Sequence, residues 1–103
     1  MINHNLSSKP YEHSYLRLND NRRKMIDEIN KVIDELFNNN VRFLRDRLEE
    51  KTDSDAKWLS YVVKLFGTPE ETLEFNKRFI DYCFQNNHKE LLTEDVIFRF
   101  ETN

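Results

Sequence analysis

The sequence predicts an all-α protein: a small helical bundle in which one long N-terminal helix packs on a helical hairpin, with a short C-terminal element. Three observations lead to this fold class. Apolar residues recur at three- and four-residue steps through residues 20–50, which is the period of an amphipathic helix. Residues 68–71 read Thr-Pro-Glu-Glu, a complete capping box with proline at the first helical position. Residues 55–66 are apolar on nearly all sides, as a central helix would be.

Residues 1–18 show no clean period, and Ser-Ser-Lys-Pro at 7–10 favours a turn or an extended stretch. We expect a partly ordered N-terminal arm in which Tyr15 and Leu18 pack on the body of the protein. The alternative is an arm that becomes ordered on a partner. Residues 19–103 are expected to form a single helical domain, which suits a chain of 103 residues.

The first long helix is predicted over residues 20–50, with Asn19 or Asp20 as its cap. Its apolar stripe consists of Ile26, Ile29, Ile33, Phe37, Val41, Leu44 and Leu48. The asparagines at 38–40 would cost a helix about 1.5–2 kcal/mol relative to alanine, so a break there is the alternative. Because the stripe passes through these asparagines in phase, a continuous helix is favoured.

A helix of that length predicts self-association. Thirty residues of α-helix extend about 45 Å, whereas a compact chain of this size is only about 34 Å across when treated as a sphere. A second copy of the chain would cover the part that protrudes. We therefore expect a homodimer.

Two further helices are predicted after a polar linker at residues 51–55. One spans residues 55–66 and ends at Gly67, which we expect to adopt the left-handed conformation that terminates helices. The other follows the capping box over residues 69–86 and carries a broad aromatic face.

Residues 93–101 allow two interpretations. Thr93, Glu94 and Asp95 can cap a short helix, whereas residues 96–100 alternate β-branched and aromatic side chains as a strand does. Because no second strand is predicted, the helix is favoured. A strand would have to pair with the same strand of another copy.

Composition excludes several classes of protein. The longest apolar run is three residues, against about 20 for a membrane-spanning helix. One cysteine excludes a disulfide framework, and one glycine excludes a glycine-rich phosphate loop. The single cysteine and the start of the chain, which resembles no secretory signal, indicate the cytoplasm. Twelve asparagines beside one alanine and one glycine are typical of an A/T-rich genome, such as that of a low-GC bacterium or its phage.

The residue pattern favours no catalytic or metal site. His4, His13 and His88 lie in predicted loops, and no two of them are three or four residues apart, as a metal-binding helix face requires. Cys83 lies on the apolar face of the third helix, where a thiol acts as a small hydrophobe. We expect no enzyme, no catalytic residue, no cofactor and no metal.

The 13 aromatic residues exceed what a small core easily covers, and aromatic side chains are enriched at protein interfaces. The sequence therefore predicts a small cytoplasmic interaction module that binds and modulates another protein of unknown identity, as an inhibitor, an adaptor or a phage anti-defence factor does. The candidate partner contacts are Phe43, Trp58, Tyr61, Phe98 and Phe100.

The alternative is a dimeric regulator that binds nucleic acid, because arginine suits phosphate binding. Its candidate contacts are two basic clusters: Arg22, Arg23 and Lys24, then Arg42, Arg45 and Arg47. Acidic residues interleave with the second cluster and the net charge is −3. The sequence also lacks the short turn and basic recognition helix of a helix-turn-helix protein. Protein binding is favoured for these reasons.

Overall fold

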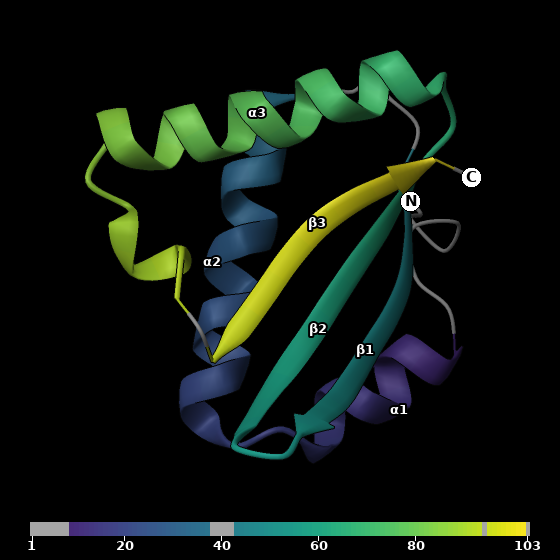
Figure 1. Ribbon diagram of the computed structural model, residues 1–103, viewed down its shortest axis with the longest axis vertical. Helices are drawn as coiled ribbons and strands as arrows, with labels where there is room; N and C mark the ends of the chain where they lie inside the picture. Colours follow the sequence, from purple (N-terminus) through teal and green to yellow (C-terminus); the bar gives the residue numbers. More distant parts are fainter. Residues whose placement is uncertain (1–8, 38–42, 94, 103) are drawn as a thin grey trace.

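The computed structural model describes residues 9–37, 43–93 and 95–102 and shows a mixed α/β fold (Figure 1). The prediction of an all-α bundle is therefore wrong. The elements are α1 (Lys9–Arg17), α2 (Asp20–Leu36), β1 (Phe43–Asp53), β2 (Ala56–Leu65), α3 (Pro69–Gln85), the short 3-10 helix η2 (Lys89–Leu91) and β3 (Val96–Thr102).

The three strands form one mixed sheet in the order β1-β2-β3. A hairpin with Ser54 and Asp55 at its turn joins β1 to the antiparallel β2, while α3 and η2 carry the chain back so that β3 runs parallel to β2. Figure 1 shows α2 behind the sheet, α3 across its upper end and α1 beside β1. The face of the sheet that points toward the viewer carries none of the described helices, and we call it the open face.

The predicted long helix ends after 17 residues, at Leu36. Asn19 caps its start as predicted, accepting a hydrogen bond from the Arg22 backbone N–H at 2.8 Å. Phe37, at its end, has extended backbone angles (φ −118°, ψ 119°), and residues 38–42 lie outside the described part. The continuous helix over 20–50 is therefore wrong, because α2 ends at Leu36 and β1 begins at Phe43, whereas the alternative of a break at residues 38–40 falls outside the described part. The expected homodimer thereby loses its basis in helix length.

A β-bulge explains why β1 resembles the end of that helix in the sequence. Phe43 and Leu48 are five residues apart, which would place them on opposite faces of a regular strand. The register shift between Arg45 and Arg47 inserts one extra residue, so both side chains face the core. The bulge therefore removes the two-residue alternation that would have indicated a strand.

The predicted helix over 55–66 is in fact β2, the central strand. Tyr61, Val62 and Val63 are all buried, because α2 covers one face and side chains from β1 and β3 cover Val62 on the other. A segment that is apolar on all sides can therefore be either a strand buried on both faces or a central helix.

The capping box before α3 is confirmed. The Thr68 N–H donates to Glu71 Oε1 at 2.8 Å, and the Glu71 N–H donates to Thr68 Oγ1 at 3.1 Å. Gly67 does not end a helix and has no positive φ, contrary to the prediction. A Cβ at this position would lie 2.8 Å from Glu71 Oε1, so the glycine makes room for the capping box.

Residues 96–102 are a strand, so the favoured helix over 93–101 is wrong. The strand interpretation was correct, but its expected partner was not, because β3 pairs with β2 of the same chain, from Leu59 with Val96 to Leu65 with Thr102.

The core between the sheet and the helices is largely aromatic. Phe37 stacks on Phe75 with 4.3 Å between ring centroids and meets Phe100 edge-on at 5.4 Å. The buried Tyr61 hydroxyl donates to Asn30 Oδ1 at 2.5 Å, so this polar group at the centre of the sheet is bonded to α2. Most of the aromatic surplus is therefore used inside this molecule.

Arg22 joins α2 to β1 and to the residue just before β3, at one end of the sheet. Its Nη1 donates to the two carboxylate oxygens of Glu50 on β1 at 2.9 and 2.8 Å. Its Nη2 and Nε donate to Asp95, just before β3, at 2.8 and 3.3 Å. The Arg22 side chain is only 15% exposed, and the hydrogen bond from Arg22 holds the pKa of Asp95 below its ordinary value of 3.8.

The substitution Arg22→Gln is expected to lower the free energy of unfolding by about 1–2 kcal/mol, because hydrogen bonds to charged groups contribute more than neutral ones but both carboxylates are half exposed and screened by water. Urea titration followed by tryptophan fluorescence measures the change. Lys24→Gln, at an exposed position two residues away, is the control and should change the value by less than about 0.5 kcal/mol. An equal loss in both variants would contradict the bridging role of Arg22.

The stability contributed by Asp95 is expected to depend on pH. Because the pKa of Asp95 is lower in the folded protein than in the unfolded chain, its contribution is complete above the unfolded pKa and is lost as pH falls through the folded pKa. The difference in unfolding free energy between the wild type and Asp95→Asn should therefore shrink below about pH 4. In an Arg22→Gln background that pH dependence should be much weaker; if it persists undiminished, Arg22 is not its cause.

Candidate functional site

α3 and β3 lie against each other like the two arms of a V. Near the closed end, the Thr72 and Thr102 hydroxyls are 2.9 Å apart. One turn further along α3, the Asn76 Nδ2 donates to the Phe100 carbonyl at 3.0 Å and the Phe100 N–H donates to Asn76 Oδ1 at 2.8 Å. Beyond Asn76 the helix diverges from the strand, and the chain returns through η2 (Figure 1).

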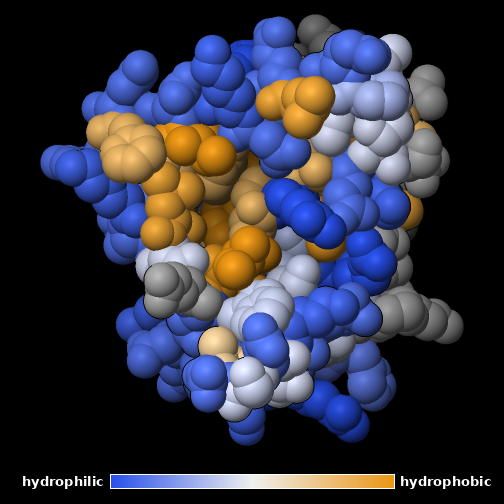
Figure 2. Space-filling model, viewed as in Figure 1, coloured by the Kyte–Doolittle hydropathy of each residue, from blue (hydrophilic) through white to orange (hydrophobic). Residues whose placement is uncertain are grey.

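An apolar groove of about 290 Å³ occupies the open part of the V. Its lining comes from α3, η2 and β3, and consists of Asn76, Phe79, Ile80, Leu91, Leu92, Thr93, Val96, Ile97 and Phe98. Phe79, Leu91 and Val96 are buried. Figure 2, which views the open face, shows a hollow there surrounded by hydrophobic side chains.

Three large apolar side chains are in contact with solvent at or next to this groove: Ile80 and Ile97 line it, and Phe84 lies one turn after Ile80 on α3. Ile80 is 44% exposed, Phe84 56% and Ile97 45%. Ile80 and Phe84 are four residues apart and share one side of α3, which is distinct from the side that places Phe79 and Cys83 in the core. Single exposed apolar residues are ordinary, but a cluster of them around a hollow is typical of an interaction surface.

A cluster of positive charge lies beside the groove on the open face. Glu101 accepts from Arg99 at 2.5 Å, Arg47 at 3.0 Å and Lys64 at 3.4 Å. Burial by itself would raise the pKa of Glu101, but the neighbouring Arg99 and the hydrogen bonds hold the pKa below its ordinary value. Three cations around one carboxylate leave a net charge of +2; we call these four residues the cation cluster.

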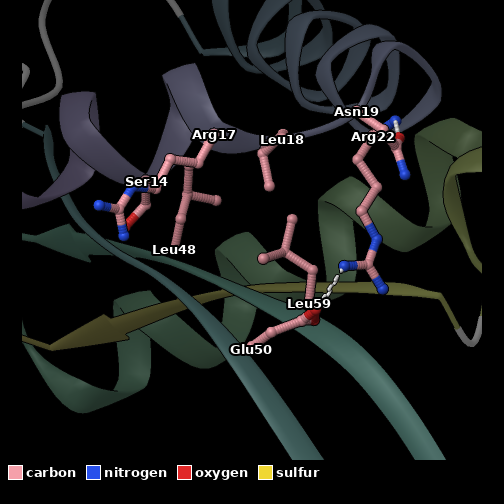
Figure 3. Close-up of a pocket in the computed structure, with 8 residues that line it drawn as sticks. All are labelled: Ser14, Arg17, Leu18, Asn19, Arg22, Leu48, Glu50 and Leu59. Carbon is pink, nitrogen blue, oxygen red and sulfur yellow. Dashed lines mark hydrogen bonds and ion pairs between the residues drawn. The ribbon is translucent and has the colours of Figure 1, made fainter.

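A second concavity of about 440 Å³ lies between the turn after α1 and strands β1 and β2 (Figure 3). In Figure 3, Leu18, Leu48 and Leu59 point toward one another at its centre, and Arg22 bonds to Glu50 at its edge. Asn19 already caps α2 and Arg22 is already bonded to two carboxylates. The Asn19, Arg22 and Glu50 side chains of this concavity therefore serve the fold, and the apolar groove is the better candidate site.

The predicted partner contacts do not form one surface. Tyr61 and Phe100 are buried, and Phe43 and Phe98 are partly buried against the core. Trp58 is half-buried on the open face, paired with Lys51 of β1. Of the five, only Phe98 lines the groove.

The sequence analysis did not single out Ile80, Phe84 and Ile97 as exposed apolar side chains. One signal was available for α3: its apolar residues cover more than the single side that a helix buries, so part of them must face solvent. Nothing comparable marked Ile97, because its exposure depends on the strand that follows from long-range pairing.

Three of the six predicted nucleic-acid contacts, Arg22, Arg23 and Arg47, form ion pairs within the protein. Arg22 bonds to Glu50 and Asp95, and Arg23 pairs with Asp20 at 2.6 Å. Lys24 is exposed. Arg42 and the side chain of Arg45 lie outside the described residues.

Cys83 is buried, and burial raises the pKa of its thiol to about 11, so the thiol is protonated at neutral pH. Within residues 9–37, 43–93 and 95–102, no three His, Cys, Asp or Glu side chains are grouped so that they could hold a metal ion. Nor does any helix in that part of the chain have the length and apolar character needed to span a membrane.

Comparison with known proteins identifies no family for this chain. Neither a protein-family model, nor a curated protein, nor a solved structure matches the chain. The function must therefore be argued from the groove and from the charges beside it.

Proposed function

We propose that this protein is an interaction module that holds a segment of a partner protein in the apolar groove between α3 and β3. The observation that supports this is the exposed border of Ile80, Phe84 and Ile97 around a hollow whose floor is buried. A small domain that leaves three large apolar side chains in water around one hollow gains free energy when another molecule covers them.

The magnitude of that gain indicates what kind of contact to expect. Fully burying one large apolar side chain contributes about 1.5–3 kcal/mol, so covering the exposed half of three contributes roughly 2–4 kcal/mol before the entropic cost of association. That corresponds to millimolar affinity at best. A useful partner must therefore add contacts outside the groove.

Binding of this kind acts on the partner by covering one of its segments, which is how a module without chemistry of its own modulates or inhibits another protein. We place the protein in the cytoplasm, supported by its single cysteine, which is free and buried. Nucleic-acid binding is the weaker proposal, because Arg22 and Arg23 already pair with carboxylates. A homodimer that uses the groove would compete with this function.

In-cell photocrosslinking tests the proposal. Replacing Phe84, at the groove, with p-benzoylphenylalanine is expected to yield a discrete crosslinked protein of higher mass on irradiation in the source cells. Phe66 is the matched control, because it is also an exposed phenylalanine (47% exposed). It lies just before the start of α3, whereas Phe84 lies near the end of that helix. Mass spectrometry identifies what is attached.

Equal yields from both positions, or none from Phe84, would contradict a partner site at the groove. A product of twice the mass of this chain would assign the groove to self-association. A product that is destroyed by nuclease and not by protease would support the nucleic-acid alternative.

A further inference from the structure

We propose that the partner segment is acidic as well as apolar, with its apolar side chains in the groove and its carboxylates on the cation cluster. This inference rests on the proposed function, because it describes the chemistry of the segment that the groove holds.

The groove and the cation cluster are continuous along β3. Ile97, Arg99 and Glu101 alternate with core-facing residues and so share the open face. In the register of the sheet Val62 lies between Arg99 and Arg47, and Glu101 lies beside Lys64. From Ile97 to Glu101 the strand rises about 13 Å, a distance that four extended residues of a partner also cover.

The charge of the cluster is opposite to that of the molecule. The whole chain carries −3, whereas Arg47, Lys64, Arg99 and Glu101 sum to +2. Glu101 is only 24% exposed and is already bonded to all three cations, while Arg99 is 62% exposed. A partner carboxylate can therefore reach the Arg99 guanidinium, and arginine binds carboxylates through two parallel hydrogen bonds.

The cation cluster adds specificity that the groove alone does not provide. The apolar side chains around the groove give only weak binding by themselves. Charged groups at the rim of an interface make binding more specific and speed association. A nucleic acid fits less well, because it carries a phosphate at every nucleotide and would place that charge over the apolar side chains of Ile80 and Ile97, whereas a peptide can place apolar residues there.

Selection from a displayed library of random 12-residue peptides, on the folded full-length protein, tests the inference. The selected peptides should carry two apolar residues followed three to five positions later by at least two aspartates or glutamates. Their affinity should weaken about three- to tenfold with Arg99→Gln, less with Arg99→Lys, and should fall as salt rises from about 50 to 300 mM. Arg17→Gln, at an exposed arginine on α1, should leave the affinity within about twofold.

Ile97→Thr separates this inference from the proposed function, because threonine keeps the β-branched shape of the exposed side chain and removes apolar surface. Peptides that lose affinity with Ile97→Thr but lack acidic residues and ignore Arg99→Gln would overturn the acidic partner and leave the groove as a protein-binding site. Peptides that ignore Ile97→Thr, or the failure to select any, would overturn both. Binding of 15-residue oligothymidylate that depends on Arg99, without any selected peptide, would overturn the inference and assign the cluster to nucleic acid.

Discussion

The parallel pairing of β3 with β2 is the constraint on which the rest of the structure depends. A hairpin can join antiparallel strands, but a parallel strand must begin at the same end as its neighbour, so the chain has to return across the molecule. α3 makes that return over 17 residues, about 25 Å of helix. It is held to the end of β3 by Asn76 and Thr72 and then departs from the strand. The groove is the space that this divergence leaves between α3 and the start of β3.

The same pairing divides the charged side chains into two groups. Asp95 arrives at the start of β3 opposite the beginning of α2, where Arg22 bonds it together with Glu50, so that group fixes the helix to the sheet. Glu101 arrives near the other end of β3 on the open face, where three cations surround it. The first group sums to −1, one cation against two half-exposed carboxylates that are both bonded to it. The second has excess positive charge beside apolar surface, and this excess is the basis of the proposed acidic partner.

Local signals predicted what local interactions determine. The capping box placed the start of α3, and Asn19 placed the start of α2, because each bonds to backbone groups within three residues. The sheet was not predicted because its determinants are long-range. The bulge at residues 45–47 hides the two-residue alternation of β1, and β2 is apolar on both faces. β3 is a strand only because Leu59 and its neighbours on β2 lie beside it. The proposed site followed the same rule. Phe98 was a candidate by its residue type, whereas Ile97 and Arg99 become candidates only through the face of β3 on which they lie.

The outer edge of β3 disfavours a partner that binds as an added strand. An edge strand offers unpaired backbone groups and invites another strand to pair with it. Here the Asn76 amide bonds both the N–H and the carbonyl of Phe100, and the Thr93 hydroxyl accepts from the Val96 N–H at 3.3 Å. Because these bonds occupy backbone groups at Val96 and Phe100, the edge of β3 does not offer a continuous row of unpaired groups to an added strand. This supports a proposed partner that is held through its side chains, by the apolar border of the groove and the cations next to it.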